Sequence, residues 1–99
     1  MSIAELQGKI QKGEYRISDH AIKRMLQRSI EQFEVVEAIV NGEIIEEYPE
    51  DKYSPSCLIY GKTGAGRDVH VQVSLPPQVV VITAYEPNPN EWIYCRIRR

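Results

Sequence analysis

Cysteine, long apolar runs and signals for export are scarce in this sequence of 99 residues. It has two cysteines, Cys57 and Cys95, and no CxxC motif or His/Cys cluster accompanies them. We therefore expect two reduced thiols, with neither a disulfide framework nor a zinc site. No apolar run approaches the roughly 18 residues of a membrane helix, and the polar N-terminal residues do not resemble a signal peptide. The expected location is the cytoplasm.

Basic residues are missing from one part of the chain. Residues 31–51 carry eight acids and no base, whereas residues 9–28 carry six bases against two acids. The net charge of −2 argues against strong nonspecific binding to nucleic acid, although a local phosphate site remains compatible with it. Opposite charges on two solvated helix faces would produce the same pattern. The charge alone therefore leaves both interpretations open.

The order of the predicted elements indicates the fold class. The length fits a single domain over residues 1–99. Capping signals and helical spacing predict helices over about 3–12, 19–28 and 30–41. Alternating or β-branched segments predict strands near 43–48, 57–60, 67–75, 79–85 and 92–97. This order predicts an α+β fold in which about two to three N-terminal helices pack on an antiparallel β-meander of about four to five strands.

The second predicted helix carries a basic ridge. His20, Arg24 and Arg28 follow one another at positions i, i+4 and i+8, which share one side of a helix. Arginine offers bidentate donors to phosphate oxygens, and histidine titrates near neutrality, so the ridge suits phosphate binding. An ordinary polar helix face is the alternative interpretation. The opposite side gathers the apolar residues Ala21, Ile22, Met25 and Leu26.

A polar strip is predicted on the sheet. Strand alternation places His70 opposite the neighbouring valines, and it places Thr83 and Tyr85 on one face of the next strand. If all three lie on the face without helices, histidine can act as a general acid or base and tyrosine can donate a proton or stack a base. Ordinary polar residues on a half-exposed sheet are the alternative. Near the end, we expect Trp92 to lock the terminus onto the core, with the closing arginines as a solvated tail or an electrostatic arm.

Two segments resemble a known family. Residues 18–28, Ser-Asp-His-Ala-Ile-Lys-Arg-Met-Leu-Gln-Arg, followed by Ile30, are similar to the opening signature of DUF4258. Residues 80–87, Val-Val-Ile-Thr-Ala-Tyr-Glu-Pro, followed by Trp92 and the closing arginines, look like its second signature. The resemblance covers about residues 15–99 and implies a RelE/ParE-like, toxin-type fold. Its polar positions fall on His20, Arg24, Arg28, His70, Thr83 and Tyr85.

The resemblance implies a metal-independent endoribonuclease from a toxin–antitoxin pair, with RNA and a small antitoxin protein as partners and no cofactor. One of His20 and His70 would deprotonate the ribose 2′-OH, and the other would protonate the leaving oxygen. Tyr85 would stack or orient the substrate, and the phosphate would be held by Arg24, Arg28 and Thr83. RelE-type toxins are strongly basic, whereas the sequence pI here is about 5.7. A non-enzymatic protein-binding module and a non-toxic domain are therefore the alternatives.

Overall fold

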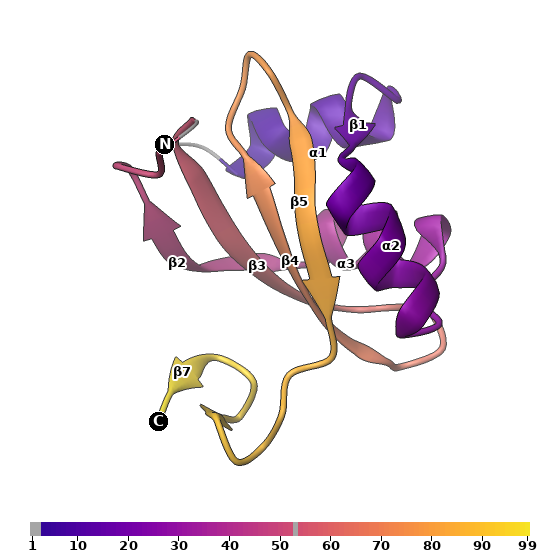
Figure 1. Ribbon diagram of the computed structural model, residues 1–99, viewed down its shortest axis with the longest axis vertical. Helices are drawn as coiled ribbons and strands as arrows, with labels where there is room; N and C mark the ends of the chain where they lie inside the picture. The colour runs from indigo at the N-terminus through magenta and orange to yellow at the C-terminus, as the bar shows by residue number, and fades with distance from the viewer. Residues whose placement is uncertain (1–2, 53) are drawn as a thin grey trace.

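The computed structural model describes residues 3–52 and 54–99, and it shows helices packed against one face of a sheet (Figure 1). The helices are α1 (Ile3–Gln11), α2 (Asp19–Gln27) and α3 (Gln32–Val40). The long strands are β2 (Glu43–Tyr48), β3 (Ser56–Lys62), β4 (Asp68–Ser74) and β5 (Val80–Tyr85). Three short strands complete the fold: β1 (Arg16–Ile17), β6 (Trp92–Ile93) and β7 (Ile97–Arg98). The predicted α+β class is confirmed.

The sheet contains one parallel pair at its edge. Its strand order is β1-β5-β4-β3-β2, and β2 to β5 are antiparallel neighbours. β1 pairs with β5 in parallel, so that Arg16 lies opposite Val80. The sequence had suggested only an extended link at this position. The link became an edge strand because α2 starts directly after it and packs along β5.

The helix side of the sheet forms an apolar core. Val69, Val71 and Val73 alternate along β4 and are fully buried, together with Ile59 and Val81 of the neighbouring strands. The predicted alternation of β4 is therefore confirmed. The helices contribute Leu6, Ala21, Val35, Ala38 and Ile39 to the same cluster. In the described part of the chain, no helix is long and apolar enough to cross a membrane.

Helix α2 is only half buried by this core. The side chain of Ser18 caps the helix by accepting a hydrogen bond from the Ala21 N–H at 3.0 Å. Ala21 is buried, but Ile22 is 45% exposed and Leu26 is 77% exposed. Half of the predicted apolar side of α2 therefore faces solvent.

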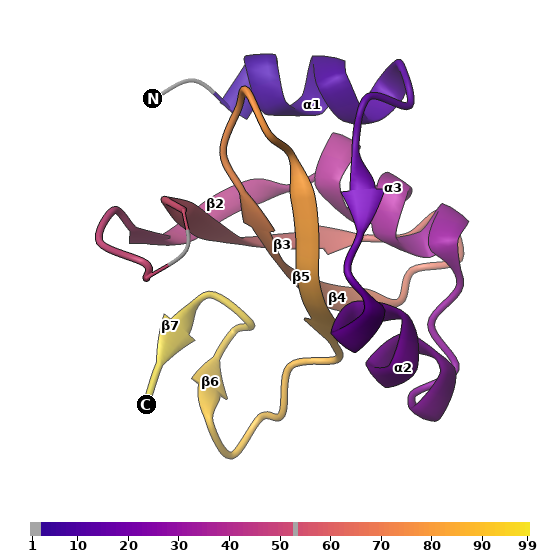
Figure 2. The same cartoon turned by 45° about the horizontal axis from the view of Figure 1, so that its top comes forward.

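A hairpin at the C terminus covers part of the other side of the sheet (Figure 2). The single strand predicted over residues 92–97 is wrong, because β6 and β7 fold back and pair Ile93 with Ile97. The chain reverses through Tyr94 and Cys95, whose φ angles of 51° and 62° lie in the left-handed region. Trp92 is 3% exposed, which confirms its expected role as a lock.

The closing arginines are neither a tail nor an arm. Arg96 forms an ion pair with Glu43, and Arg98 forms one with Glu46 at 3.0 Å. The acidic segment therefore anchors the hairpin through β2. Both cysteines are free thiols, as expected, and burial is the main cause that raises the pKa of Cys57 to about 11.

Candidate functional site

His70 lies at the centre of the hairpin side of the sheet. It is fully buried, with its Nε2 atom 2.6 Å from the Cys95 carbonyl oxygen and its Nδ1 atom 3.3 Å from the Tyr85 hydroxyl. A carbonyl oxygen can only accept, so Nε2 carries the proton and Nδ1 accepts from Tyr85 in the neutral ring. Burial is the main cause that lowers the pKa of His70. The ring is therefore neutral at pH 7.

Aromatic rings enclose this histidine. Trp92, Tyr85 and Tyr60 all meet the imidazole edge-on, with ring centroids at 4.5, 5.3 and 5.8 Å. Edge-to-face geometry is a favoured arrangement for such rings. His70 thus joins the sheet to the hairpin, and in this state solvent does not reach it.

An open cleft lies beside this cluster, where β5 ends. It has a volume of about 580 Å³. Arg28, the C-cap of α2, forms one wall, and its Nη1 atom donates to the Ala84 carbonyl oxygen at 2.9 Å. The Arg28 guanidinium carbon is 5.9 Å from the centroid of the Tyr85 ring. The complete lining is Arg28, Tyr85, Glu86, Glu91, Trp92 and Arg98.

Two charges of the cleft are neutralised within the protein. Arg98 pairs with Glu46, and its guanidinium carbon is 4.6 Å from the Trp92 ring centroid. Glu86 pairs with Arg67 at 3.0 Å. Arg67 also donates to the carbonyl oxygens of Arg28 and Ser29 and pairs with Glu34, so it fixes the end of α2 beside the end of β5.

Two other charges of the cleft remain available to a ligand. Within residues 3–52 and 54–99, neither Arg28 nor Glu91 forms an ion pair. Tyr85 lies between the sheet and this cleft, and burial is the main cause that raises its pKa. The cleft therefore offers a guanidinium, a carboxylate and a phenol that stays protonated near neutral pH.

The structure brings together some of the predicted site residues. Arg28, His70 and Tyr85 gather at the end of β5, and Thr83 lies two residues earlier on the same face, opposite Gln72. Arg24 donates instead to Gln27 at 3.2 Å. His20 is exposed in the first turn of α2, and among the described residues no hydrogen bond or ring contact links it to His70.

Sequence reasoning missed four charged residues in and beside the cleft: Glu86, Glu91, Arg98 and Arg67. Glu91 ends a turn-rich segment that has no periodicity, and Arg98 reaches the cleft only because the hairpin reverses the chain. Arg67 follows a glycine-rich turn, where a solvated side chain is the usual expectation. The signal that could have found Glu91 is its position beside Trp92, which was already expected to dock on the core.

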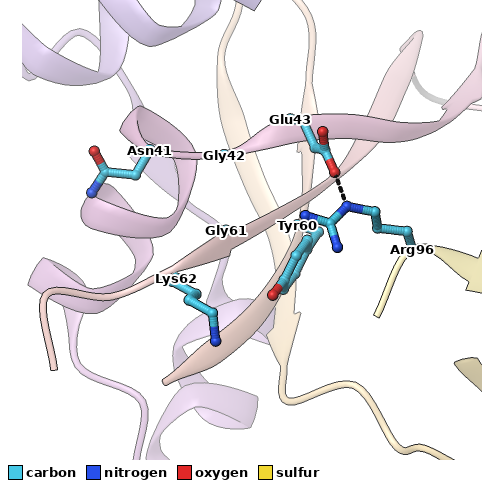
Figure 3. Close-up of a pocket in the computed structure, with 7 residues that line it drawn as sticks. All are labelled: Asn41, Gly42, Glu43, Tyr60, Gly61, Lys62 and Arg96. Carbon is cyan, nitrogen blue, oxygen red and sulfur yellow. Dashed lines mark hydrogen bonds and ion pairs between the residues drawn. The ribbon is translucent and has the colours of Figure 1, made fainter. Parts of the chain in front are cut away.

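A second hollow lies at the β2–β3 edge, with a volume of about 290 Å³ (Figure 3). Beside it α3 approaches β3 so closely that a Cβ atom on Gly61 would collide with the Ala38 carbonyl oxygen. Its two cations are both neutralised, since Arg96 pairs with Glu43 and Lys62 pairs with Asp68 at 2.8 Å.

This second hollow therefore has no spare charge for a ligand, and the cleft at the end of β5 is the better candidate site. In the described part of the chain, no group of three or more His, Cys, Asp or Glu residues is arranged to hold a metal ion.

The fold and the cleft define a class: an α+β protein whose sheet ends in an aromatic cleft walled by an arginine. Residues 17–86 match the family described as "Domain of unknown function (DUF4258)", and the chain belongs to this family. No curated protein and no solved structure shows significant similarity to the chain. The matched segment includes Arg28, His70 and Tyr85, whereas α1 and the C-terminal hairpin lie outside it.

Proposed function

We propose that this protein is a toxin-type, metal-independent endoribonuclease with a RelE/ParE-like fold. One observation carries the proposal: Arg28 has no ion-pair partner among the described residues and lies beside the Tyr85 ring in an open cleft. Arginine binds phosphate through paired N–H donors, and stacking of a base on an aromatic ring contributes about 1–3 kcal/mol. Together these groups suit one nucleotide of a single strand of RNA.

The charged groups of the cleft suit cleavage by the ribose itself. In this mechanism the Glu91 carboxylate accepts the proton of the ribose 2′-OH, and O2′ then attacks the phosphorus atom. The bond from phosphorus to O5′ breaks, and O5′ takes the proton of the Tyr85 hydroxyl. Arg28 balances the charge that develops on the phosphate oxygens. The products are a 2′,3′-cyclic phosphate and a 5′-hydroxyl, after which Glu91 and Tyr85 exchange protons with water.

His70 acts in this mechanism as a positioning residue. Its Nδ1 atom is 3.3 Å from the Tyr85 hydroxyl, and its full burial keeps it from touching RNA in this state. As the acceptor of the Tyr85 O–H, it holds the phenol in place until the hydroxyl turns its proton toward the leaving O5′. The scheme in which one of His20 and His70 is the general base and the other is the general acid stays a prediction. A His20→Ala variant tests it, because that scheme requires a large loss of cleavage and the present one does not.

Cleavage of a fluorescent single-stranded RNA in the presence of EDTA tests the proposal. Arg28→Ala should lower the rate about 10²–10³-fold, as for the loss of one donor that stabilises a developing oxyanion. Glu91→Gln should lower it about 10²–10⁴-fold, as for the loss of a general base. Lys23→Ala is the matched control, because Lys23 is exposed on the same helix and does not line the cleft. The products should carry 5′-hydroxyl ends.

Three results would contradict the nuclease. They are intact RNA with the wild type, equal rates for Arg28→Ala and Lys23→Ala, or products that carry 5′-phosphates. Thermal melts of all variants should agree within a few degrees, so that a lost rate cannot be assigned to unfolding. Glu91 and Lys23 are both exposed and form no ion pair within the described residues, which makes large changes in stability unexpected.

A second candidate function is binding to a protein partner. One observation favours it: Ile22 and Leu26 are 45% and 77% exposed, and they line an apolar groove of about 290 Å³ with Ile17, Met25 and Ile30. Exposed apolar surface of this kind marks interaction sites. The occupant we propose is a small antitoxin protein that presents an amphipathic segment with a basic flank. Glu31, the first acid of the acidic segment, lines the same groove.

Growth after inducible expression separates the two candidate functions. If the protein acts only through binding, growth should stop while total RNA stays intact, and Arg28→Ala should leave the growth arrest unchanged. If the protein is a nuclease, growth arrest should accompany RNA breakdown, and Arg28→Ala should relieve both. Leu26→Glu should then abolish only the neutralisation by an antitoxin that is expressed with it.

A further inference from the structure

A more enclosed hollow lies at the other end of β5, and no function has been assigned to it. Its volume is about 410 Å³, and its lining includes Arg16, Ser18, Asp51, Ser74, Val80 and Ile82. We call it the β5 cup. Val80 and Ile82 flank Val81, which is fully buried in the core on the helix side. The pairing of β5 with β4 is irregular between Gln72 and Val73, so regular alternation does not hold across Ile82, and both flanking residues are placed by their part in the lining of the β5 cup.

The polar groups of the β5 cup differ in how they are used. The Ser74 hydroxyl donates to the Gln78 carbonyl oxygen at 2.7 Å and accepts from the Val80 N–H at 2.8 Å. It therefore shapes the wall. Asp51 contributes a carboxylate whose Oδ2 atom accepts from Ser56 at 2.7 Å and from Gln72 at 3.3 Å. These two donors fix the position of the carboxylate in the wall of the β5 cup.

Arg16 supplies a cation at the rim. It is exposed, it lies opposite Val80 in the parallel pair, and it forms no ion pair within residues 3–52 and 54–99. The β5 cup thus combines an apolar floor, an oriented carboxylate and an available guanidinium. A nucleotide has the matching parts: a flat ring, exocyclic amino donors on most bases, and a phosphate.

We propose that the β5 cup binds a nucleobase of single-stranded RNA. Val80 and Ile82 contact the face of the base, Asp51 accepts a hydrogen bond from its exocyclic amino group, and Arg16 binds the phosphate. This proposal rests on the proposed function and extends it, because it makes the β5 cup a second subsite for the strand that is cut in the cleft.

One RNA strand can span the distance between the two subsites. Val80 and Tyr85 are separated by five residues of β5, or roughly 16 Å at the rise of a strand. That distance corresponds to about five nucleotides if the bases are stacked at 3.4 Å, and to fewer if the strand is extended. Thr83 lies between the two subsites on the same face, where the sequence had predicted a contact with the substrate.

Calorimetric titration with the four ribonucleoside 5′-monophosphates tests the β5 cup. GMP, AMP and CMP carry an exocyclic amino group and UMP does not, so the first three should bind at least about fivefold more tightly. Arg16→Ala should weaken all four about tenfold, as expected for a lost charge-assisted contact. Asp51→Asn should remove the preference over UMP. Lys12→Ala is the control, since Lys12 is exposed, carries the same charge and does not line the β5 cup.

Arg28→Ala identifies the site that is being measured, because mononucleotides bound in the β5 cup should keep their affinity in this variant. Equal affinity for UMP and the other three, or unchanged binding in Arg16→Ala, would overturn the proposal that the β5 cup binds a nucleobase. Neither result would bear on the proposed nuclease. Selective binding that depends on Arg16, together with no RNA cleavage by the wild type, would support the β5 cup and contradict the nuclease. If no mononucleotide binds, only the proposal that the β5 cup binds a nucleobase is overturned.

Discussion

The two sides of the sheet are stabilised by different physical means. On the helix side, Val71 and Val81 are fully buried among other apolar side chains. On the hairpin side, the fully buried residue at the centre is His70, which is held by hydrogen bonds, ring contacts and ion pairs of the surrounding hairpin. Apolar burial is non-directional, whereas hydrogen bonds and ion pairs require fixed geometry and a defined protonation state.

This difference separates stability from function. The helix side fixes the fold through an apolar cluster that carries no charge near neutral pH. The hairpin side and the C-cap of α2 together place charged and aromatic groups around an open cleft, and in the described structure this cleft holds both Arg28 and Glu91 without ion-pair partners. Substitutions on the two sides should therefore have distinguishable effects.

The largest effect is expected on the helix side. Ile59→Ala should lower the free energy of unfolding by about 2–5 kcal/mol, because Ile59 is fully buried and the change leaves a cavity. Ile97→Ala on the hairpin should change it by less than about 0.5 kcal/mol, since Ile97 is 61% exposed. Denaturant unfolding measures both. Similar losses in the two variants would break the distinction between the two sides.

An intermediate effect is expected from pH. Burial lowers the pKa of His70 in the folded state below its ordinary value of 6.5, so the unfolded chain binds more protons in mildly acidic solution. Stability should therefore be full above about pH 6.5 and should fall as the pH drops toward 5, where most carboxylates are still ionised. Thermal melts at intervals of half a pH unit measure this loss.

Two substitutions assign the loss to one ring. His70→Gln should make the melting temperature nearly independent of pH between 5 and 7, although the variant is less stable throughout. His20→Gln should keep the wild-type pH dependence, because His20 is exposed. If the melting temperature of His70→Gln still falls between pH 7 and pH 5, protonation of His70 is not the cause of the lost stability.

The smallest effect is expected at the hairpin turn. Tyr94 has a φ angle of 51°, a conformation that asparagine adopts more readily than tyrosine. Tyr94→Asn should raise the free energy of unfolding by a few tenths to about 1 kcal/mol, and Tyr94→Val should lower it, because a β-branched residue is disfavoured there. Since Tyr94 is 85% exposed, lost packing contributes little. The same sign for both substitutions would contradict the left-handed turn.

The sequence predicted the elements that have a clear local pattern. The alternation of β4, the Ser18 cap of α2 and the end of α3 were predictable, because periodicity and caps are local properties. The cap of α3 was predicted wrongly at Ser29, since Glu31 takes that position, and the cap predicted for α1 at Ser2 lies outside the described residues. The parallel pairing of β1 was not, since two residues carry no periodicity and their partner, Val80, is distant in the sequence. The C-terminal hairpin was missed because its turn uses Tyr94 and Cys95 in place of glycine or asparagine.

The candidate site was predictable only in part, for the same reason. Arg28, His70 and Tyr85 were identified from helical spacing and strand alternation. The burial of His70 depends on Trp92 and Cys95, which fold over it only when the chain reverses. The availability of Glu91 depends on which acids find a basic partner in the fold. Local patterns do not specify such pairings.

One measurement tests the central claim, that RNA binds on the hairpin side of the sheet. Backbone amide and tryptophan indole NMR signals of the labelled protein would be followed during titration with a short single-stranded RNA at low salt. We predict shifts of the Trp92 indole and of the amides of Arg28, Tyr85 and Glu91, with α1 unchanged. Shifts confined to α1 and α3, or no shifts at an excess of RNA, would contradict the claim.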